Sequence, residues 1–137
     1  MRARIVLVLL LLSVSSCLWR SYGEVMRVHL DVLSSLADKA AANVQDGRRP
    51  ASNDVTELSY PLQRGRQFVY QYRSYDDRAS YRLFVAALDR YQAFVEAIDG
   101  ARGDEARWTA ERADLDAKYQ SWRNAAADAR AALARES

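Results

Sequence analysis

Apolar residues recur along most of this chain at alternating steps of three and four positions, the spacing of one face of an α-helix. The first such series consists of Met26, Leu30, Leu33, Ala37, Ala40 and Val44. Gly47 then stands where a helix end favours a left-handed residue, and Pro50 blocks further helix. The pattern therefore predicts a first helix over residues 22–46.

A second series over residues 54–73 consists of Val55, Leu58, Leu62, Val69 and Tyr72. Asp54, followed three residues later by Glu57, is similar to a capping box and marks the expected helix start. Pro61 lacks an N–H and disfavours helical geometry at Tyr60, so this helix either kinks near Tyr60 or begins there.

A third series over residues 77–99 is the most regular: Tyr81, Phe84, Leu88, Tyr91, Val95 and Ile98. Its phase differs from that of the second series, which indicates a new helix or a twist within one long helix. Capping side chains at residues 74–77 favour the new helix. Three helices, with a long central one over 54–99, are the alternative.

The strongest turn signal is residues 99–104, which contain Gly100 and Gly103. A last helix over residues 104–135 follows, with an apolar face of Trp108, Leu115, Tyr119, Trp122, Ala126, Ala129 and Leu133. An amphipathic helix must bury its apolar face, and four antiparallel helices do so economically. The sequence predicts an all-α fold, a small antiparallel bundle of four helices.

The N-terminus has a different composition. Arg2 and Arg4 precede an uninterrupted apolar run, residues 5–12, which is shorter than the ~20 residues that a membrane span needs. A basic start, a short apolar run and small residues after it are typical of a secretory signal peptide.

The next residues, Val14-Ser15-Ser16-Cys17, resemble the lipobox of bacterial lipoproteins. The resemblance covers residues 1–17 only, and no family is indicated for the rest of the chain. It implies that residues 1–16 are removed and that Cys17 becomes the first mature residue and carries fatty acyl chains such as palmitate. An ordinary signal peptide cut nearby is the alternative.

This resemblance defines the expected domains: a signal peptide over 1–16, a lipidated tether over 17–23 and a helical bundle domain over 24–137. In Gram-negative lipoproteins an aspartate after the cysteine usually signals inner-membrane retention, and this chain has Leu18 there. The resemblance thus implies a lipid anchor in the outer membrane with the domain facing the periplasm. In a bacterium with one membrane, the anchor would lie in the cell membrane.

Composition excludes several classes of function. The chain has 20 basic and 18 acidic residues, and removal of residues 1–16 would take away Arg2 and Arg4. The balanced charge argues against nucleic-acid binding, which depends on a basic surface. One histidine, His29, and one cysteine cannot form the usual zinc or di-iron sites, so we expect no metal and no cofactor.

Candidate catalytic groups have simpler explanations. The paired acids at 76–77, at 104–105 and at 114 and 116 fall at helix starts or on polar faces, where they answer the helix dipole. Serines have no base nearby in the sequence. We therefore expect a protein that is not an enzyme.

Aromatic residues concentrate between residues 60 and 94 and alternate with arginines. One core face cannot hold all these rings, and tyrosine and arginine are favoured at protein interfaces. The candidate partner-binding surface consists of Tyr70, Tyr75, Arg66 and Arg73. Its partner could be a protein of the cell envelope, a peptidoglycan strand or a second copy of the chain.

These observations favour a lipid-anchored, non-enzymatic protein of the envelope. It would act either as an adaptor or assembly factor or as a structural binding module. Secretion pilotins are similar in size and architecture, and they hold a partner's amphipathic helix in a groove. The alternative is a bundle that binds a small apolar or aromatic ligand between its helices, near Tyr81, Tyr91, Trp108 and Trp122.

Overall fold

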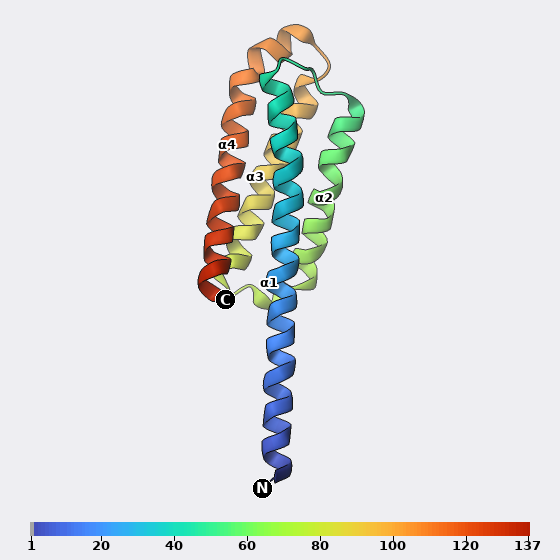
Figure 1. Ribbon diagram of the computed structural model, residues 1–137. Helices are drawn as coiled ribbons and strands as arrows, with labels where there is room; N and C mark the ends of the chain where they lie inside the picture. The colour runs from blue at the N-terminus through green and yellow to red at the C-terminus, as the bar shows by residue number, and fades with distance from the viewer. Residues whose placement is uncertain (1) are drawn as a thin grey trace.

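The computed structural model describes the backbone of residues 2–137 and the side chains of residues 21–137. Its elements are α1 (Arg2–Gln45), α2 (Ser52–Gln71), the short 3-10 helix η1 (Arg73–Tyr75), α3 (Ala79–Ala101) and α4 (Glu105–Glu136). Figure 1 shows the four long helices side by side and alternating in direction. The predicted all-α, antiparallel four-helix bundle is confirmed.

The break between the second and third helices is real, so the alternative with one long central helix is wrong. Residues 72–78 form η1 and the turns around it, and α3 starts anew at Ala79. Pro61 lies inside α2 without ending it. α2 starts at Ser52, earlier than expected, because the Asp54 carboxylate accepts the N–H of Ala51 at 2.7 Å from the third position of the helix.

The first helix is longer than the predicted 22–46, because α1 runs without a break from Arg2 to Gln45. The expected tether, 17–23, also overlaps the bundle, since Tyr22 and Gly23 are both buried. The bundle therefore begins near residue 22. The proposed signal peptide, 1–16, and the side chain of Cys17 lie outside the residues whose side chains the structure describes.

α3 and α4 make the most extensive helix pair. Small buried side chains line both of them: Ser80, Ala87 and Ala101 on α3, and Ala126, Ala129 and Ala132 on α4. Small residues let two helix backbones approach closely. α1 packs against α2 and α4 to a similar extent and barely touches α3, so it closes the bundle opposite α3 (Figure 1).

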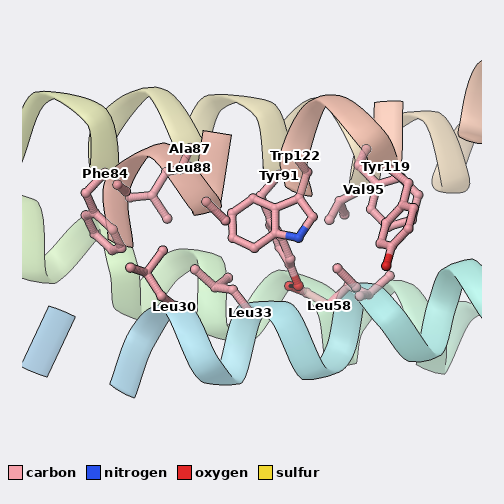
Figure 2. Close-up of a cluster of buried hydrophobic side chains, with 14 of the residues drawn as sticks. Leu30, Leu33, Leu58, Phe84, Ala87, Leu88, Tyr91, Val95, Tyr119 and Trp122 are labelled. Atoms are coloured by element: carbon pink, nitrogen blue, oxygen red, sulfur yellow. Dashed lines mark hydrogen bonds between the residues drawn. The ribbon is translucent and has the colours of Figure 1, made fainter. Parts of the chain in front are cut away.

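The core contains large rings as well as aliphatic side chains (Figure 2). Tyr91 of α3 meets Trp122 of α4 edge to face, with ring centroids 5.1 Å apart. The Tyr91 hydroxyl donates to the carbonyl oxygen of Leu58 in α2 at 2.8 Å. A buried tyrosine needs such an acceptor, because an unmade hydrogen bond would cost about 1–3 kcal/mol.

The carbonyl groups at the end of α1 accept hydrogen bonds from a turn with a left-handed glycine and from an arginine side chain. Gly47 has φ 77°, and the N–H groups of Gly47 and Arg48 donate back to the carbonyls of Val44 and Asn43, which is a Schellman motif. From α4, the Arg112 guanidinium donates to the carbonyls of Val44 and Gln45, both at 3.1 Å. These contacts explain why an arginine stands between Trp108 and Leu115 on the apolar side of α4.

At the opposite end of the bundle, one polar chain joins three helices. The Glu136 carboxylate of α4 accepts the backbone N–H of Ser80 at 3.0 Å and also accepts the Ser80 hydroxyl. The Tyr22 hydroxyl of α1 lies 2.9 Å from the Ser80 oxygen. Because the serine hydrogen goes to Glu136, Tyr22 is the donor in that pair. Glu136 thus caps α3 and fixes the position of α1.

α2 and α3 pack tightly against each other at Gly65. A Cβ atom on Gly65 would lie 2.8 Å from Cδ2 of Leu88, a fully buried side chain. The sequence Arg64-Gly65-Arg66, with a glycine between two arginines, is therefore explained by helix packing.

We expect Gly65→Ala to lower the free energy of unfolding by about 1–3 kcal/mol, because Leu88 must shift to make room for the added methyl group in a packed core. Urea denaturation followed by circular dichroism measures this change. The matched control is Gly103→Ala, where no atom lies within 4 Å of the new Cβ; there we expect a change of less than about 1 kcal/mol. Equal stability of the two variants would contradict the proposed close approach.

Candidate binding surfaces

An aromatic cluster occupies the end of the bundle where α1 enters it. Four rings form this cluster: Tyr22, Phe68, Tyr72 and Tyr75. The closest pair is Tyr22 and Tyr75, whose rings stack with centroids 4.5 Å apart and planes 12° apart. Burial raises the pKa of Tyr22 to about 12, so its hydroxyl stays protonated at neutral pH. The cluster therefore holds α1 against α2 and η1.

Tyr75 was expected to be exposed, and the structure shows it half-buried in this aromatic cluster. It lies in η1, where helical periodicity does not apply, and its ring covers Tyr22. The prediction of an exposed Tyr75 is therefore wrong.

Arg66 also has a structural role. Its guanidinium donates to the carboxylate of Asp89 at 2.8 Å and to the amide oxygen of Gln92 at 2.9 Å, both on α3. Such an exposed ion pair contributes only about 0–1 kcal/mol, but it orients the side chain across the seam between α2 and α3. Arg66 is thus directed toward the neighbouring helix.

Tyr70 is exposed as predicted, with 69% of its surface accessible. Arg73 stacks on it, with the guanidinium carbon 4.4 Å from the ring centroid. An N–H of Arg73 also donates to the carbonyl oxygen of Tyr70 at 2.9 Å. Of the four predicted surface residues, the structure leaves Tyr70 and Arg73 as one exposed pair.

Large apolar side chains are also exposed on α1 and α2. Val28 and Val32 are 60% and 45% exposed, one helical turn apart, and Tyr60 on α2 is 64% exposed. We call these three residues the apolar face. Sequence reasoning missed it, although two valines at i and i+4 outside the core series of a helix were a usable signal.

Along the same two helices, a cleft of about 150 Å³ opens near the turn between α1 and α2. Its apolar lining includes Leu36, Ala40, Val44, Pro50, Leu58 and Ile98. Its charged rim includes Lys39 and Glu57, which form an ion pair at 3.6 Å. Apolar walls with charges at the edge match a site for an amphipathic segment.

A larger open cleft, of about 370 Å³, lies between α1 and α4. Phe94 and Tyr119 are among its lining residues, and the Tyr119 hydroxyl donates to the Asp38 carboxylate at 2.5 Å. Burial, aided by this bond and the charge of Asp38, raises the pKa of Tyr119 to about 12. The hydroxyl therefore binds α4 to α1 over the whole physiological pH range.

The residues expected to surround a small ligand are buried: Tyr81, Tyr91, Trp108 and Trp122. The Tyr81 hydroxyl donates to the carbonyl oxygen of Val69 at 2.7 Å, so it is already paired within the protein. Within residues 21–137, Nε1 of Trp122 is buried and has no hydrogen-bond partner. Both clefts described above are lined by other residues.

Two of the candidate reactive side chains, Ser80 and Asp104, have structural roles. The Ser80 hydroxyl is buried and bonded to Tyr22 and Glu136. Asp104 caps α4 by accepting the N–H of Ala106 at 2.8 Å. Among the described side chains, no three His, Cys, Asp or Glu residues come together to hold a metal ion, and no helix there is apolar over enough length to span a membrane.

Comparisons with protein-family models, with curated proteins and with solved structures find no match for this chain.

His29 is half-buried, and its ring lies 5.4 Å from Phe68 and 6.3 Å from Phe84. Burial, with a smaller contribution from the charge of Arg64, lowers the pKa of His29 below its usual 6.5. His29 therefore binds a proton less readily in the folded chain than in the unfolded chain.

From this pKa shift we expect stability to fall as pH drops from about 7.5 to 5.5, because the unfolded state binds more protons in that range. His29→Gln removes the titrating group and should flatten the dependence. Urea midpoints measured across this range for both chains test the expectation. An equally steep loss in the variant would assign the pH effect to other groups.

Proposed function

We propose that this chain is a lipid-anchored envelope lipoprotein whose helical domain is a non-enzymatic adaptor or assembly module. The lipobox-like sequence ending in Cys17 supports the anchor. Acyl chains supply ~0.8 kcal/mol per buried CH₂, and more than one chain is needed for stable attachment. The proposed site is the outer membrane with the domain in the periplasm, or the cell membrane where there is only one membrane.

Two observations carry the adaptor proposal: the exposed valines of α1, and the cleft between α1 and α2. Exposed valines one turn apart are costly in water unless another surface covers them. The cleft has apolar walls and a charged rim, and both features suit an amphipathic helix of a partner protein. The proposed mode resembles that of secretion pilotins in architecture only, and fold alone does not imply function.

The binding surface proposed here differs from the one that the sequence predicted. Tyr75 and Arg66 are committed to contacts within the bundle, whereas Val28, Val32 and Tyr60 project outward. A partner helix would lie along α1 and α2 and would reach the cleft with its apolar side. A protein partner is favoured over a small ligand, because the Tyr91 and Trp122 rings already pack against each other and the Tyr81 hydroxyl is already bonded to Val69.

The anchor is tested on the protein isolated from its own membranes. We expect the intact mass to correspond to a chain that starts at Cys17 and carries acyl groups. Cys17→Ser should abolish the added lipid mass and the cut before residue 17. Ser13→Ala, outside the lipobox-like residues, is the matched control and should behave as wild type. A bare or differently cut wild-type N-terminus would refute the anchor.

The apolar face is tested by changing its charge. In wild type, cross-linking in membranes should join the protein to its partner. Val28→Lys/Val32→Lys should abolish this cross-linked product, because two ammonium groups oppose burial of this face. Ala127→Lys/Ala131→Lys adds the same charges at i and i+4 on the exposed side of α4. Both variants should keep wild-type thermal unfolding. Identical cross-linked partners in all three proteins would refute the proposed surface.

A further inference from the structure

The exposed Tyr70–Arg73 pair lies at the end of the bundle where α1 enters. Ser21 of α1 reaches the same region, since its hydroxyl lies 3.3 Å from that of Tyr72. The Tyr22 and Tyr72 rings are 5.6 Å apart. Figure 1 shows α1 continuing past the bundle from this end, below the connection between α2 and α3. The chain toward Cys17 therefore leaves the bundle beside the residues that carry this pair.

The distance from a lipid on Cys17 to this end is short. Four peptide steps separate Cys17 from Ser21, which span ~6 Å as helix and at most ~14 Å when fully extended. The polar zone of a bilayer is ~5–8 Å thick on each side of the hydrocarbon. This step depends on the lipid anchor proposed above. Given that anchor, the end of the bundle meets the headgroup layer.

Tyr70 and Arg73 have the chemistry that this layer favours. Tyrosine concentrates at membrane interfaces, where its ring contacts acyl chains and its hydroxyl stays wet. The arginine guanidinium matches phosphate geometry, and its donation to the Tyr70 carbonyl holds it beside the ring. Exposed acids, Asp76 and Asp77, lie in the same connection. The mixed charge suits a zwitterionic lipid headgroup better than a strongly anionic surface.

We propose that Tyr70 and Arg73 form a second membrane contact, in which Arg73 binds a phospholipid phosphate and Tyr70 enters the interface next to it. Two contacts, the acylated Cys17 and this pair, define an orientation that one anchor alone cannot. The bundle then stands with the connection between α2 and α3 against the bilayer. The cleft between α1 and α2, at the far end, faces away from the lipid.

The test uses the full-length lipidated protein in vesicles of zwitterionic phosphatidylethanolamine and phosphatidylcholine whose acyl chains are brominated. Ser74→Cys places a nitrobenzoxadiazole fluorophore beside the pair while keeping Tyr70 and Arg73. Ser35→Cys, exposed on the outer side of α1, is the control position. We expect bromine to remove most of the emission at 74 and to leave the emission at 35 unchanged.

A second comparison asks whether the pair itself makes the contact. Tyr70→Ala/Arg73→Ala, combined with the label at 74, should restore the emission. Tyr60→Ala/Arg90→Ala removes an exposed tyrosine and an exposed arginine elsewhere and should leave the quenching in place. Unquenched emission at 74 in the parent, or unchanged quenching after loss of the pair, would overturn the proposal.

Failure of the anchor gives a different result. An acylated Cys17 takes no thiol label, and the wild-type protein should float with the vesicles in a density gradient. Labelled wild type that does not float would refute the anchor itself. The second contact alone would be refuted if wild type floats and takes no label while the labelled Ser74→Cys and Ser35→Cys proteins show equal emission.

Discussion

The structure depends on the burial of one face of α1. Its core residues are Tyr22, Met26, Leu30, Leu33, Ala37, Ala41 and Val44, all of them buried. Because α1 packs between α2 and α4, its removal would expose the inner faces of both helices to water. The helix that leads back to Cys17 is therefore also the fourth helix of the bundle, and the position of the proposed anchor is physically linked to the integrity of the core.

The polar contacts determine how the helices are aligned along their axes. Tyr81 and Tyr91 of α3 each donate to a carbonyl of α2, while Arg112 of α4 donates to carbonyls at the end of α1. Each bond contributes only about 1 kcal/mol, yet a shift by one turn would leave a buried group unpaired. The apolar faces thus provide most of the stability, and these few bonds select one alignment.

Sequence periodicity was sufficient for the fold and insufficient for the surfaces. The change of phase between the second and third series left a new helix or a twist within one helix open, and the capping side chains at 74–77 correctly favoured the break that η1 occupies. Periodicity assigns a residue to a face but does not identify its neighbour. Arg66 was therefore placed on an open surface, although Asp89 and Gln92 lie within its reach. Tyr75 lies in η1, outside the α-helices, where the three-and-four spacing does not assign a residue to a face.

The two ends of the bundle are held together in different ways. At one end, short turns join α1 to α2 and α3 to α4, so the contacts there are close in sequence. At the other end, Tyr22, Ser80 and Glu136 are separated by more than fifty residues from one another along the chain, and their contact requires closure of long loops. Because closing a long loop costs chain entropy, we expect such contacts to form after the local hairpins. Folding should thus advance from the turns toward the aromatic cluster. The end of the bundle next to the segment that leads to Cys17 would then form last.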